Sequence, residues 1–374
     1  MQNLGSLELV VLIVFGVVAL IQFFYYLFFY LKIGFPAPFA KPDSQPPVSI
    51  VICARDEEEN LRNNLPGILD QDYPDFEVVL VDDCSSDNTE FLLKEYTARY
   101  PHFRYTRIHQ DDKFMHGKKL ALTVGIKSAK NEWLLLTDAD CRPAGRNWLS
   151  GMAAHFSENT GVVLGYGGFE QGRGLLNLLI RYDALFIAIQ YLSFAMRGIP
   201  YMGVGRNLAY RKQLFFENRG FASHNHLASG DDDLFIREVA TRKNTQTEFE
   251  EDCHTRTKAK ESFRLWLLQK KRHLTTSNHY KPGVKFLLGL EPLSRALFYV
   301  FFIVALSLSL FPEYVAGVFL LRWVLQLIVL RIASKRLKEK YLLLPSLLFD
   351  LFLPFFYLGM FFANLFNRKK YQWR

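Results

Sequence analysis

The chain has 374 residues, half of them hydrophobic, with 34 Phe, 18 Tyr and a formal net charge of +8. This composition is too apolar for one ordinary soluble domain, and four scattered cysteines exclude a disulfide framework. The charge does not predict nucleic-acid binding, because no zinc-finger spacing or RNA-binding signature accompanies it; we attribute much of it to residues that face anionic lipid.

The chain begins with an apolar segment that is long enough to cross a bilayer. Val10–Leu31 is uncharged, whereas a transmembrane helix needs about 20 apolar residues. No basic residue precedes it and no small-residue cleavage site follows, which argues against a signal peptide. We expect an uncleaved anchor over residues 1–34 and a stiff, Pro-rich linker over residues 35–47.

Residues 48–280 alternate between strand-like and helix-like segments, which predicts an α/β domain with a mostly parallel, Rossmann-like sheet. The expected elements in chain order are strand Val48–Cys53, helix Glu57–Leu69, strand Glu77–Val81, helix Asn88–Arg99, strand Phe103–Arg107, helix Lys118–Ala129, strand Trp133–Thr137, strand Val162–Tyr166, a strand near Leu208–Tyr210, a helix from Asp232, a strand around Gln246–Glu250 and helix Phe263–His273.

Residues 281–374 are expected to form an interfacial helix and about three transmembrane helices, over roughly Ala296–Phe311, Val315–Ile332 and Tyr341–Phe366. The Lys and Arg distribution predicts an outside N-terminus and a cytoplasmic middle domain in a multi-pass protein of the cell (inner or plasma) membrane. Four spans would place the basic tail Arg368-Lys369-Lys370 outside, against this rule, and prolines in the last segment leave a kinked, re-entrant or interfacial course open. Arg322 and Asp350 lie inside apolar segments, and we predict that they form an ion pair.

A pair of acids follows the expected strand Trp133–Thr137, in the sequence Asp138-Ala139-Asp140. Alternate side chains of an extended chain point the same way, and open α/β sheets bind ligands beyond the carboxyl ends of their strands. Carboxylates combined with substrate phosphates typically hold Mg2+ or Mn2+. The pair therefore predicts a metal–diphosphate site formed by Asp138 and Asp140.

Acids also follow the first two strands, in Ala54-Arg55-Asp56-Glu57 and Asp82-Asp83, where they could bind a base and a ribose. Helix capping explains Asp56 and Asp87 equally well, whereas ligand binding is favoured for Asp83. No Gly-rich phosphate loop follows the first strand, which argues against a dinucleotide oxidoreductase and a P-loop NTPase. Phosphate charge must then be met by the metal and by cations such as Lys118 and Arg272, while Lys119 is expected on a solvated helix face.

Two further segments carry candidate site residues. Gly230-Asp231-Asp232-Asp233 places three acids at the start of a helix, where mutual repulsion raises at least one pKa and suits a general base; an ordinary acidic helix start is the alternative. Gln269, Arg272 and His273 lie within about one helical turn and could contact one ligand, or belong to a basic helix on the membrane surface. The turn Gly203–Asn207 would allow an acceptor to approach closely.

The order of these segments resembles that of family 2 glycosyltransferases. The similar segments are Val48–Asn60 (opening strand and loop), Val81–Thr89 (uridine-binding strand end), Gly117-Lys118 with Ala121-Leu122 (Gly-Lys helix), Asp138–Asp140 (Asp-x-Asp metal site), Gly230–Asp233 (acceptor-side acids, usually Glu-Asp) and Gln269–His273 (Gln-x-x-Arg-Trp signature). Two positions depart from the pattern: His273 replaces the Trp associated with holding the acceptor in processive synthases, and Gly230 stands where the family has Glu.

The resemblance implies a GT-A fold and inverting transfer of a sugar from a nucleoside-diphosphate sugar, with a UDP-sugar as first candidate, to a lipid or glycan acceptor. Asp231, or alternatively Asp232, would be the base, and Asp138 and Asp140 would hold Mg2+ or Mn2+. A polyprenyl-phosphate glycosyltransferase and an inactive membrane-anchored nucleotide- or sugar-binding scaffold remain the alternatives. The implied substrate-binding residues are Ala54, Asp56, Glu57, Asp82, Asp83, Lys118, Asp138, Asn207, Gln269, Arg272 and His273.

Overall fold

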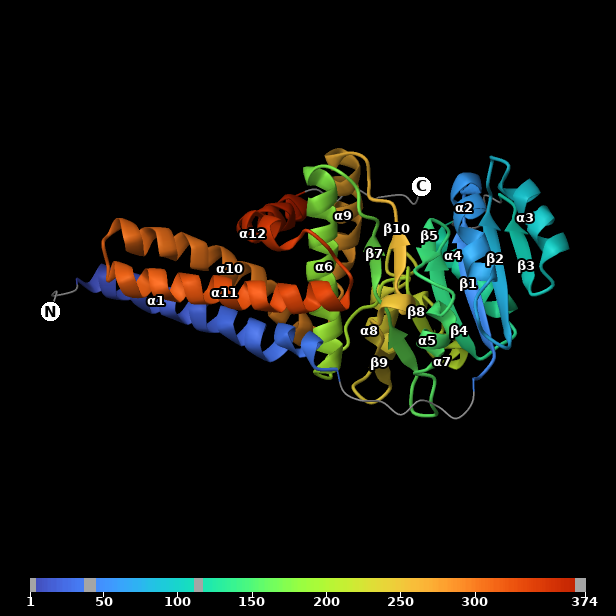
Figure 1. The fold of residues 1–374 in the computed structure, drawn as a ribbon, viewed down its shortest axis with the longest axis horizontal. Helices are drawn as coiled ribbons and strands as arrows, with labels where there is room; N and C mark the ends of the chain where they lie inside the picture. The colour runs from blue at the N-terminus through green and yellow to red at the C-terminus, as the bar shows by residue number, and fades with distance from the viewer. Residues whose placement is uncertain (1–4, 37–44, 111–116, 367–374) are drawn as a thin grey trace.

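A computed structural model describes residues 5–36, 45–110 and 117–366 of the chain, so most of the Pro-rich linker and the basic C-terminal tail lie outside the described residues. An α/β domain lies at one end of the molecule, and a bundle of long apolar helices extends from it at the other (Figure 1). This is the arrangement expected of a GT-A domain with one N-terminal and three C-terminal membrane helices.

The domain is built on a mixed seven-stranded sheet in the order β3-β2-β1-β4-β8-β6-β9, beside a three-stranded sheet in the order β5-β10-β7. The first four strands of the large sheet are parallel, as predicted, and β8 runs antiparallel to both of its neighbours. The strands are β1 (Val48–Ala54), β2 (Phe76–Asp83), β3 (Phe103–Ile108), β4 (Trp133–Asp138), β5 (Cys141–Pro143), β6 (Val162–Leu164), β7 (Gly167–Phe169), β8 (Leu208–Arg211), β9 (Thr245–Thr247) and β10 (Thr255–Thr257).

Helices cover both faces of the large sheet, and this is why its central strands read as continuous apolar runs. Every residue of β1 is buried, and the two faces of the sheet belong to separate hydrophobic clusters. The helices of the domain are α2 (Glu58–Leu69), α3 (Thr89–Arg99), α4 (Lys118–Ser128), α5 (Trp148–Ala153), α6 (Leu175–Met196), α7 (Lys212–Glu217), α8 (Asp233–Val239) and α9 (Phe263–Ser277).

The expected strand Val162–Tyr166 differs from the structure, which divides this region into β6 and β7, strands of two different sheets. The chain leaves the large sheet at Gly165, which packs closely against the side chain of Asn207. A Cβ atom at Gly165 would lie 2.5 Å from that amide, so the change of direction depends on a glycine here.

The helix α6 has no counterpart among the predicted elements. It is apolar enough to be a candidate membrane span, although most of it is buried within the protein. In Figure 1 it runs across the direction of the bundle, between the bundle and the sheet, with α9 along the same boundary. A helix buried on nearly all sides lacks the polar face that reveals a helix by periodicity, which explains why the prediction missed it.

The bundle contains α1 (Ser6–Phe24, continued by a π-helical segment and a 3₁₀ turn to Gly34), α10 (Pro282–Ser307) and α11 (Pro312–Arg336), which lie side by side (Figure 1). The last helix, α12 (Leu343–Phe366), is strongly foreshortened in this view, so it runs in a different direction from these three. All four are long and apolar enough to cross a membrane.

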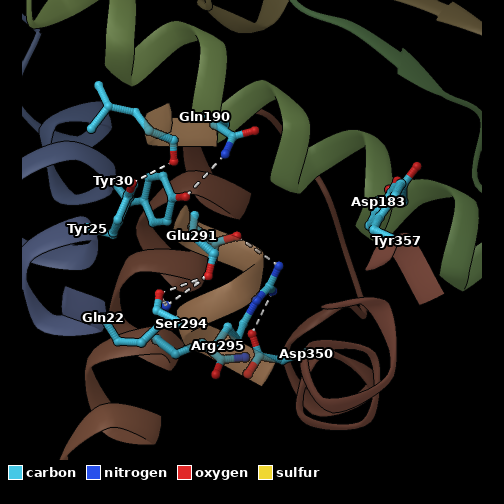
Figure 2. Close-up of polar contacts among 12 residues, drawn as sticks. Gln22, Tyr25, Tyr30, Asp183, Gln190, Glu291, Ser294, Arg295, Asp350 and Tyr357 are labelled. Carbon is cyan, nitrogen blue, oxygen red and sulfur yellow. Dashed lines mark hydrogen bonds and ion pairs between the residues drawn. The ribbon is translucent and has the colours of Figure 1, made fainter. Parts of the chain in front are cut away.

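The predicted ion pair between Arg322 and Asp350 is confirmed, with 2.5 Å between Nη1 and Oδ2. Arg295 lies 3.0 Å from the same carboxylate and 3.1 Å from Glu291, so two cations and two anions share one buried cluster. Gln22 connects α1 to this cluster through Ser294 and Arg322, and Figure 2 shows the side chains of Gln22, Glu291, Arg295 and Asp350 converging from several helices. Because the charges balance, the cluster can persist inside an apolar bundle.

Candidate active site

The carboxyl ends of β2, β1 and β4 meet at one edge of the large sheet, and acidic residues stand at this edge. Asp82 is in register with Ala54 on β1, and Asp138 is in register with Cys53 on the other side of β1. Asp82 and Asp83 are fully buried. The structure therefore brings together three of the segments that the sequence marks as candidate site segments.

Asp56 and Glu57 lie on the loop that follows β1. The Asp56 carboxylate accepts hydrogen bonds from the backbone N–H (2.7 Å) and hydroxyl (2.9 Å) of Ser86, and the backbone bond holds the pKa of Asp56 below its ordinary value. It thus joins two rim loops instead of capping a helix. Capping does explain Asp87, which accepts from the first backbone N–H groups of α2 (3.1 Å) and α3 (3.0 Å). Glu57 is half-buried, and burial raises its pKa.

Asp138 ends β4, and Asp140 lies in the turn between β4 and β5. One carboxylate oxygen from each, together with the Cys141 Sγ, lie within 4.8 Å of one another. Both aspartates remain partly exposed, whereas Cys141 is buried, and burial raises the pKa of its thiol well above the ordinary value. A neutral thiol is a poor ligand, so the hard oxygen atoms of the two aspartates are the donors that fit Mg2+ or Mn2+.

Lys118, at the start of α4, joins this pair to the acids of the α8 region. Its Nζ lies 2.7 Å from Asp138 Oδ1 and 3.0 Å from Asp231 Oδ2. A small cavity next to this contact is lined by all three side chains and by Asp232. One ammonium group thus bridges the candidate metal ligand and the candidate base, which are far apart in the sequence.

The three consecutive acids occupy different environments. Burial raises the pKa of Asp231, but the Lys118 ammonium outweighs it and the net shift is downward. The pKa of Asp232 is raised to about 7 by burial and by the charges of Asp231 and Asp233, although Asp232 Oδ2 accepts a 2.9 Å hydrogen bond from the Gly205 N–H. One pKa is raised as expected, but burial is the larger cause and repulsion among the acids adds to it.

Asp233 has a different task, because its carboxylate fixes the end of α9. It accepts hydrogen bonds from the Thr276 hydroxyl and from the Tyr280 hydroxyl, the latter at 2.8 Å. The same helix carries Gln269, Arg272 and His273. The Arg272 Nε is buried and has no hydrogen-bond acceptor among the described residues, which leaves a guanidinium N–H available for an anion.

Comparison with known proteins agrees with this geometry. Residues 49–218 match the model of Glycosyl transferase family 2. The chain is 30% identical over 93 residues to a poly-beta-1,6-N-acetyl-D-glucosamine synthase of Staphylococcus epidermidis, covering 25% of this chain and 21% of that protein. It is 30% identical over 127 residues to the glycosyltransferase AglE of Haloferax volcanii, covering 33% of this chain and 40% of that protein.

The chain carries a family 2 glycosyltransferase domain. Its fold is similar to that of a mannosyltransferase from Pyrobaculum calidifontis, solved in complex with GDP-Man and Mn2+, with a TM-score of 0.59 and 17% identity over 89% of this chain and 99% of that one. The chain covers less than half the length of the two curated relatives named above.

Within this glycosyltransferase domain, Lys119 differs from expectation. It is buried instead of lying on a solvated helix face, and its ammonium donates to the carbonyls of His224 (2.6 Å) and Leu227 (3.0 Å). Burial lowers its pKa to about 8. The two consecutive lysines therefore have different contacts: Lys118 forms ion pairs with the acids, and Lys119 donates to the loop that precedes Asp231.

Asn207 also sits differently from the predicted substrate contact. Its amide accepts from Trp148 Nε1 (3.0 Å) and donates to the carbonyls of Tyr166 (3.0 Å) and Cys253 (2.7 Å), and the residue is fully buried. These contacts leave it little capacity to bind a ligand. The neighbouring Arg206, which the sequence analysis did not single out, has a buried Nη1 without an acceptor among the described residues. Its position in a glycine-rich turn is the only sequence signal.

Proposed function

We propose that the chain is a membrane-bound, inverting glycosyltransferase that moves a sugar from a nucleoside-diphosphate sugar to a lipid or glycan acceptor. The observation that carries the proposal is the Lys118 bridge between Asp138 and Asp231, because it joins a metal-ligand candidate and a base candidate at one sheet edge. A UDP-sugar is the first donor candidate. Its support is the position of Asp82 and Asp83 at the carboxyl end of β2, where acids could bind a base and a ribose.

In this mechanism Asp231 takes the proton from an acceptor hydroxyl, whose oxygen forms the new bond to the anomeric carbon. The bond from that carbon to the diphosphate breaks, and the nucleoside diphosphate leaves with the electron pair. Asp138 and Asp140 would hold Mg2+ or Mn2+, which supplies positive charge for the leaving diphosphate. Arg272 and Gln269 on α9 would stabilise the same charge by hydrogen bonds.

The proposed location is the cell membrane, with the catalytic domain on the cytoplasmic side. Five long apolar helices within the described residues support a membrane protein. The excess of Lys and Arg after the first of them supports the cytoplasmic side for the domain.

Hydrolysis of nucleotide sugars by the purified full-length protein with Mn2+ tests the proposal. Asp140→Asn and Asp231→Asn should each lower the rate about 100-fold or more, because each removes charge from the reacting centre. Asp72→Asn is the matched control: Asp72 is exposed and precedes β2, at the opposite edge of the sheet, so the rate should not change. If the wild type neither hydrolysed nor transferred UDP- and GDP-sugars, with membrane extracts supplied as acceptors, the inactive scaffold would be favoured.

A further inference from the structure

Arg206 lies in the turn that enters β8, at the same sheet edge as the metal-ligand candidates. Because β8 is antiparallel to β4, with Leu136 in register with Leu208, the beginning of β8 lies beside the end of β4. The order along the edge is therefore the nucleotide-side acids on β2 and β1, then Asp138 on β4, then Arg206. Arg206 is on the side of the metal-ligand candidates that faces away from the proposed nucleotide site.

The backbone around Arg206 is fixed from three directions. Its carbonyl accepts hydrogen bonds from the hydroxyls of Thr137 (3.0 Å) and Thr255 (2.9 Å), and Thr137 directly precedes Asp138. The preceding residue, Gly205, donates its N–H to Asp232 at 2.9 Å. These hydrogen bonds connect the turn to β4, which carries Asp138, to β10 of the small sheet, and to Asp232, one of the two candidates for the general base.

The Arg206 side chain lies over the small sheet, with its guanidinium 4.5 Å from the centre of the Phe169 ring. Gly167 makes this path possible, since a Cβ there would approach the Arg206 Cβ to 2.8 Å. The face of an aromatic ring attracts the cation but accepts none of its in-plane N–H groups, so the ring does not satisfy the buried Nη1.

Two other arginines of this region are paired with acids, in contrast to Arg206. Arg142 pairs with Glu170 at 3.0 Å, and Arg181 pairs with Glu339 at 2.6 Å. Among the described residues, Arg206 has no ion pair and no side-chain hydrogen bond. A half-buried guanidinium without an acid, on a turn whose backbone is bound to Asp232, is suited to bind an anion that enters with a substrate.

We infer that Arg206 binds an anionic group of the acceptor, a phosphate or a carboxylate, close to the hydroxyl that receives the sugar. The inference rests on the proposed function, and the position of Arg206 decides between donor and acceptor. In an inverting displacement the acceptor approaches the anomeric carbon opposite the leaving diphosphate, and Arg206 lies on the side of Asp138 that faces away from the proposed nucleotide site, in a turn whose Gly205 N–H binds Asp232.

The test uses the full-length protein in detergent and acceptor lipids and glycans extracted from membranes of the cells that make it. Arg206→Gln should raise the KM for the extracted acceptor about 10-fold, a change that corresponds to about 1.4 kcal/mol. Arg206→Lys should recover part of the loss, because it keeps the charge. Arg142→Gln removes an arginine that pairs with an acid on the same small sheet, and it should leave transfer unchanged.

Two further measurements show whether the anion that Arg206 binds belongs to the donor diphosphate or to the acceptor. Binding of UDP and GDP with Mn2+, measured by calorimetry, and hydrolysis without acceptor should be the same in Arg206→Gln and wild type. A loss of nucleotide affinity would assign the residue to the donor diphosphate and overturn the inference. Anion-exchange fractionation of the extract should retain the acceptor activity, and its appearance in the neutral fraction would also overturn it.

Activation of the retained fraction with a carbodiimide, followed by reduction with borohydride, converts carboxylates to alcohols and leaves phosphates in place, and so identifies which group Arg206 binds. Unchanged transfer by Arg206→Gln would show that the residue only packs against Phe169. Failure of the proposed function looks different, because the wild type itself would then hydrolyse no nucleotide sugar.

Discussion

At the scale of single residues, the site depends on how three adjacent aspartates divide their tasks. Asp231 pairs with Lys118, Asp232 accepts backbone N–H groups, and Asp233 fixes α9. The pKa of Asp231 is lowered and that of Asp232 is raised to about 7. Asp231 is the better candidate for the base by position, because Lys118 joins it to the metal-ligand candidate Asp138, while the raised pKa of Asp232 keeps that residue as the alternative.

This difference predicts a pH profile. If the ionised form of Asp232 is needed, kcat/KM should fall as the pH drops below about 7, since a carboxyl with a raised pKa binds its proton there. Asp232→Asn should retain measurable activity and lose this limb, whereas Asp231→Asn should be inactive from about pH 5 to about pH 9. Measurement of kcat/KM across this range checks both. An inactive Asp232→Asn combined with an active Asp231→Asn would reverse the assignment.

For single residues, the sequence was informative where an acidic side chain stands at the end of an expected strand or at the start of an expected helix. Asp138, Asp140 and Asp231 could be chosen because their segments follow one another in the order of the family's motifs, although an acid at a helix start, such as Asp231, also has an ordinary structural explanation. Asn207 and Lys119 could not be judged in the same way, because the sequence does not reveal that the buried carbonyls of Tyr166, Cys253 and His224 need their donors. Satisfaction of buried polar groups is a property of the tertiary structure.

At the scale of elements, α9 connects the site to the membrane region. Its Lys270 forms a buried ion pair with Asp183 on α6, and Tyr357 on α12 donates to the same carboxylate (Figure 2 shows the Asp183–Tyr357 contact). Trp266 on α9 stacks on Phe356 of α12, with ring centroids 5.3 Å apart. The helix that carries Gln269, Arg272 and His273 is thus held by two apolar helices and not by the catalytic domain alone.

Asp183→Asn should therefore impair both stability and catalysis. Removing one partner of a buried ion pair typically costs about 3–5 kcal/mol, because the other charge stays buried without compensation. We expect a lower melting temperature and weaker UDP–Mn2+ binding, and the double variant Asp183→Asn/Lys270→Gln should recover part of each loss. Lys271→Gln, one position further along α9, is the control. Additive losses in the double-mutant cycle would show that the pair does not position α9.

Helices and strands could be predicted from the sequence where only one face is buried, or where acids, glycines or prolines mark their ends. The four parallel strands and the helices between them follow from alternation of apolar runs with amphipathic segments. The helix α6 lacked such a signal, and the antiparallel position of β8 depends on a crossover that local sequence does not encode. Both features matter for the site, since α6 supports α9 and β8 places Arg206.

At the scale of the whole molecule, the charge balance of the bundle restricts how its helices can be arranged. Arg322, Asp350, Arg295 and Glu291 neutralise one another, which requires α10, α11 and α12 to meet at one depth. Further along α12, Phe356 and Tyr357 contact α9 and α6, at the boundary with the catalytic domain. Over residues 350–357, α12 therefore stays close to the catalytic domain and runs in a different direction from the other three helices (Figure 1).

This geometry predicts three membrane spans, α1, α10 and α11, with α6 and α12 lying across them near the cytoplasmic side. An odd number of spans from an outside N-terminus returns the chain to the cytoplasm, so the tail with Arg368, Lys369 and Lys370 would obey the positive-inside rule that four spans violate. A green fluorescent protein fused to the C-terminus should therefore be fluorescent in a bacterial host, and alkaline phosphatase fused there should be inactive. Phosphatase fused after Tyr314, which is exposed in the first turn of α11 at the end of the bundle far from the catalytic domain, should be active and serves as the control (Figure 1). An active phosphatase at the C-terminus would require α12 to cross the bilayer and would restore the four-span arrangement.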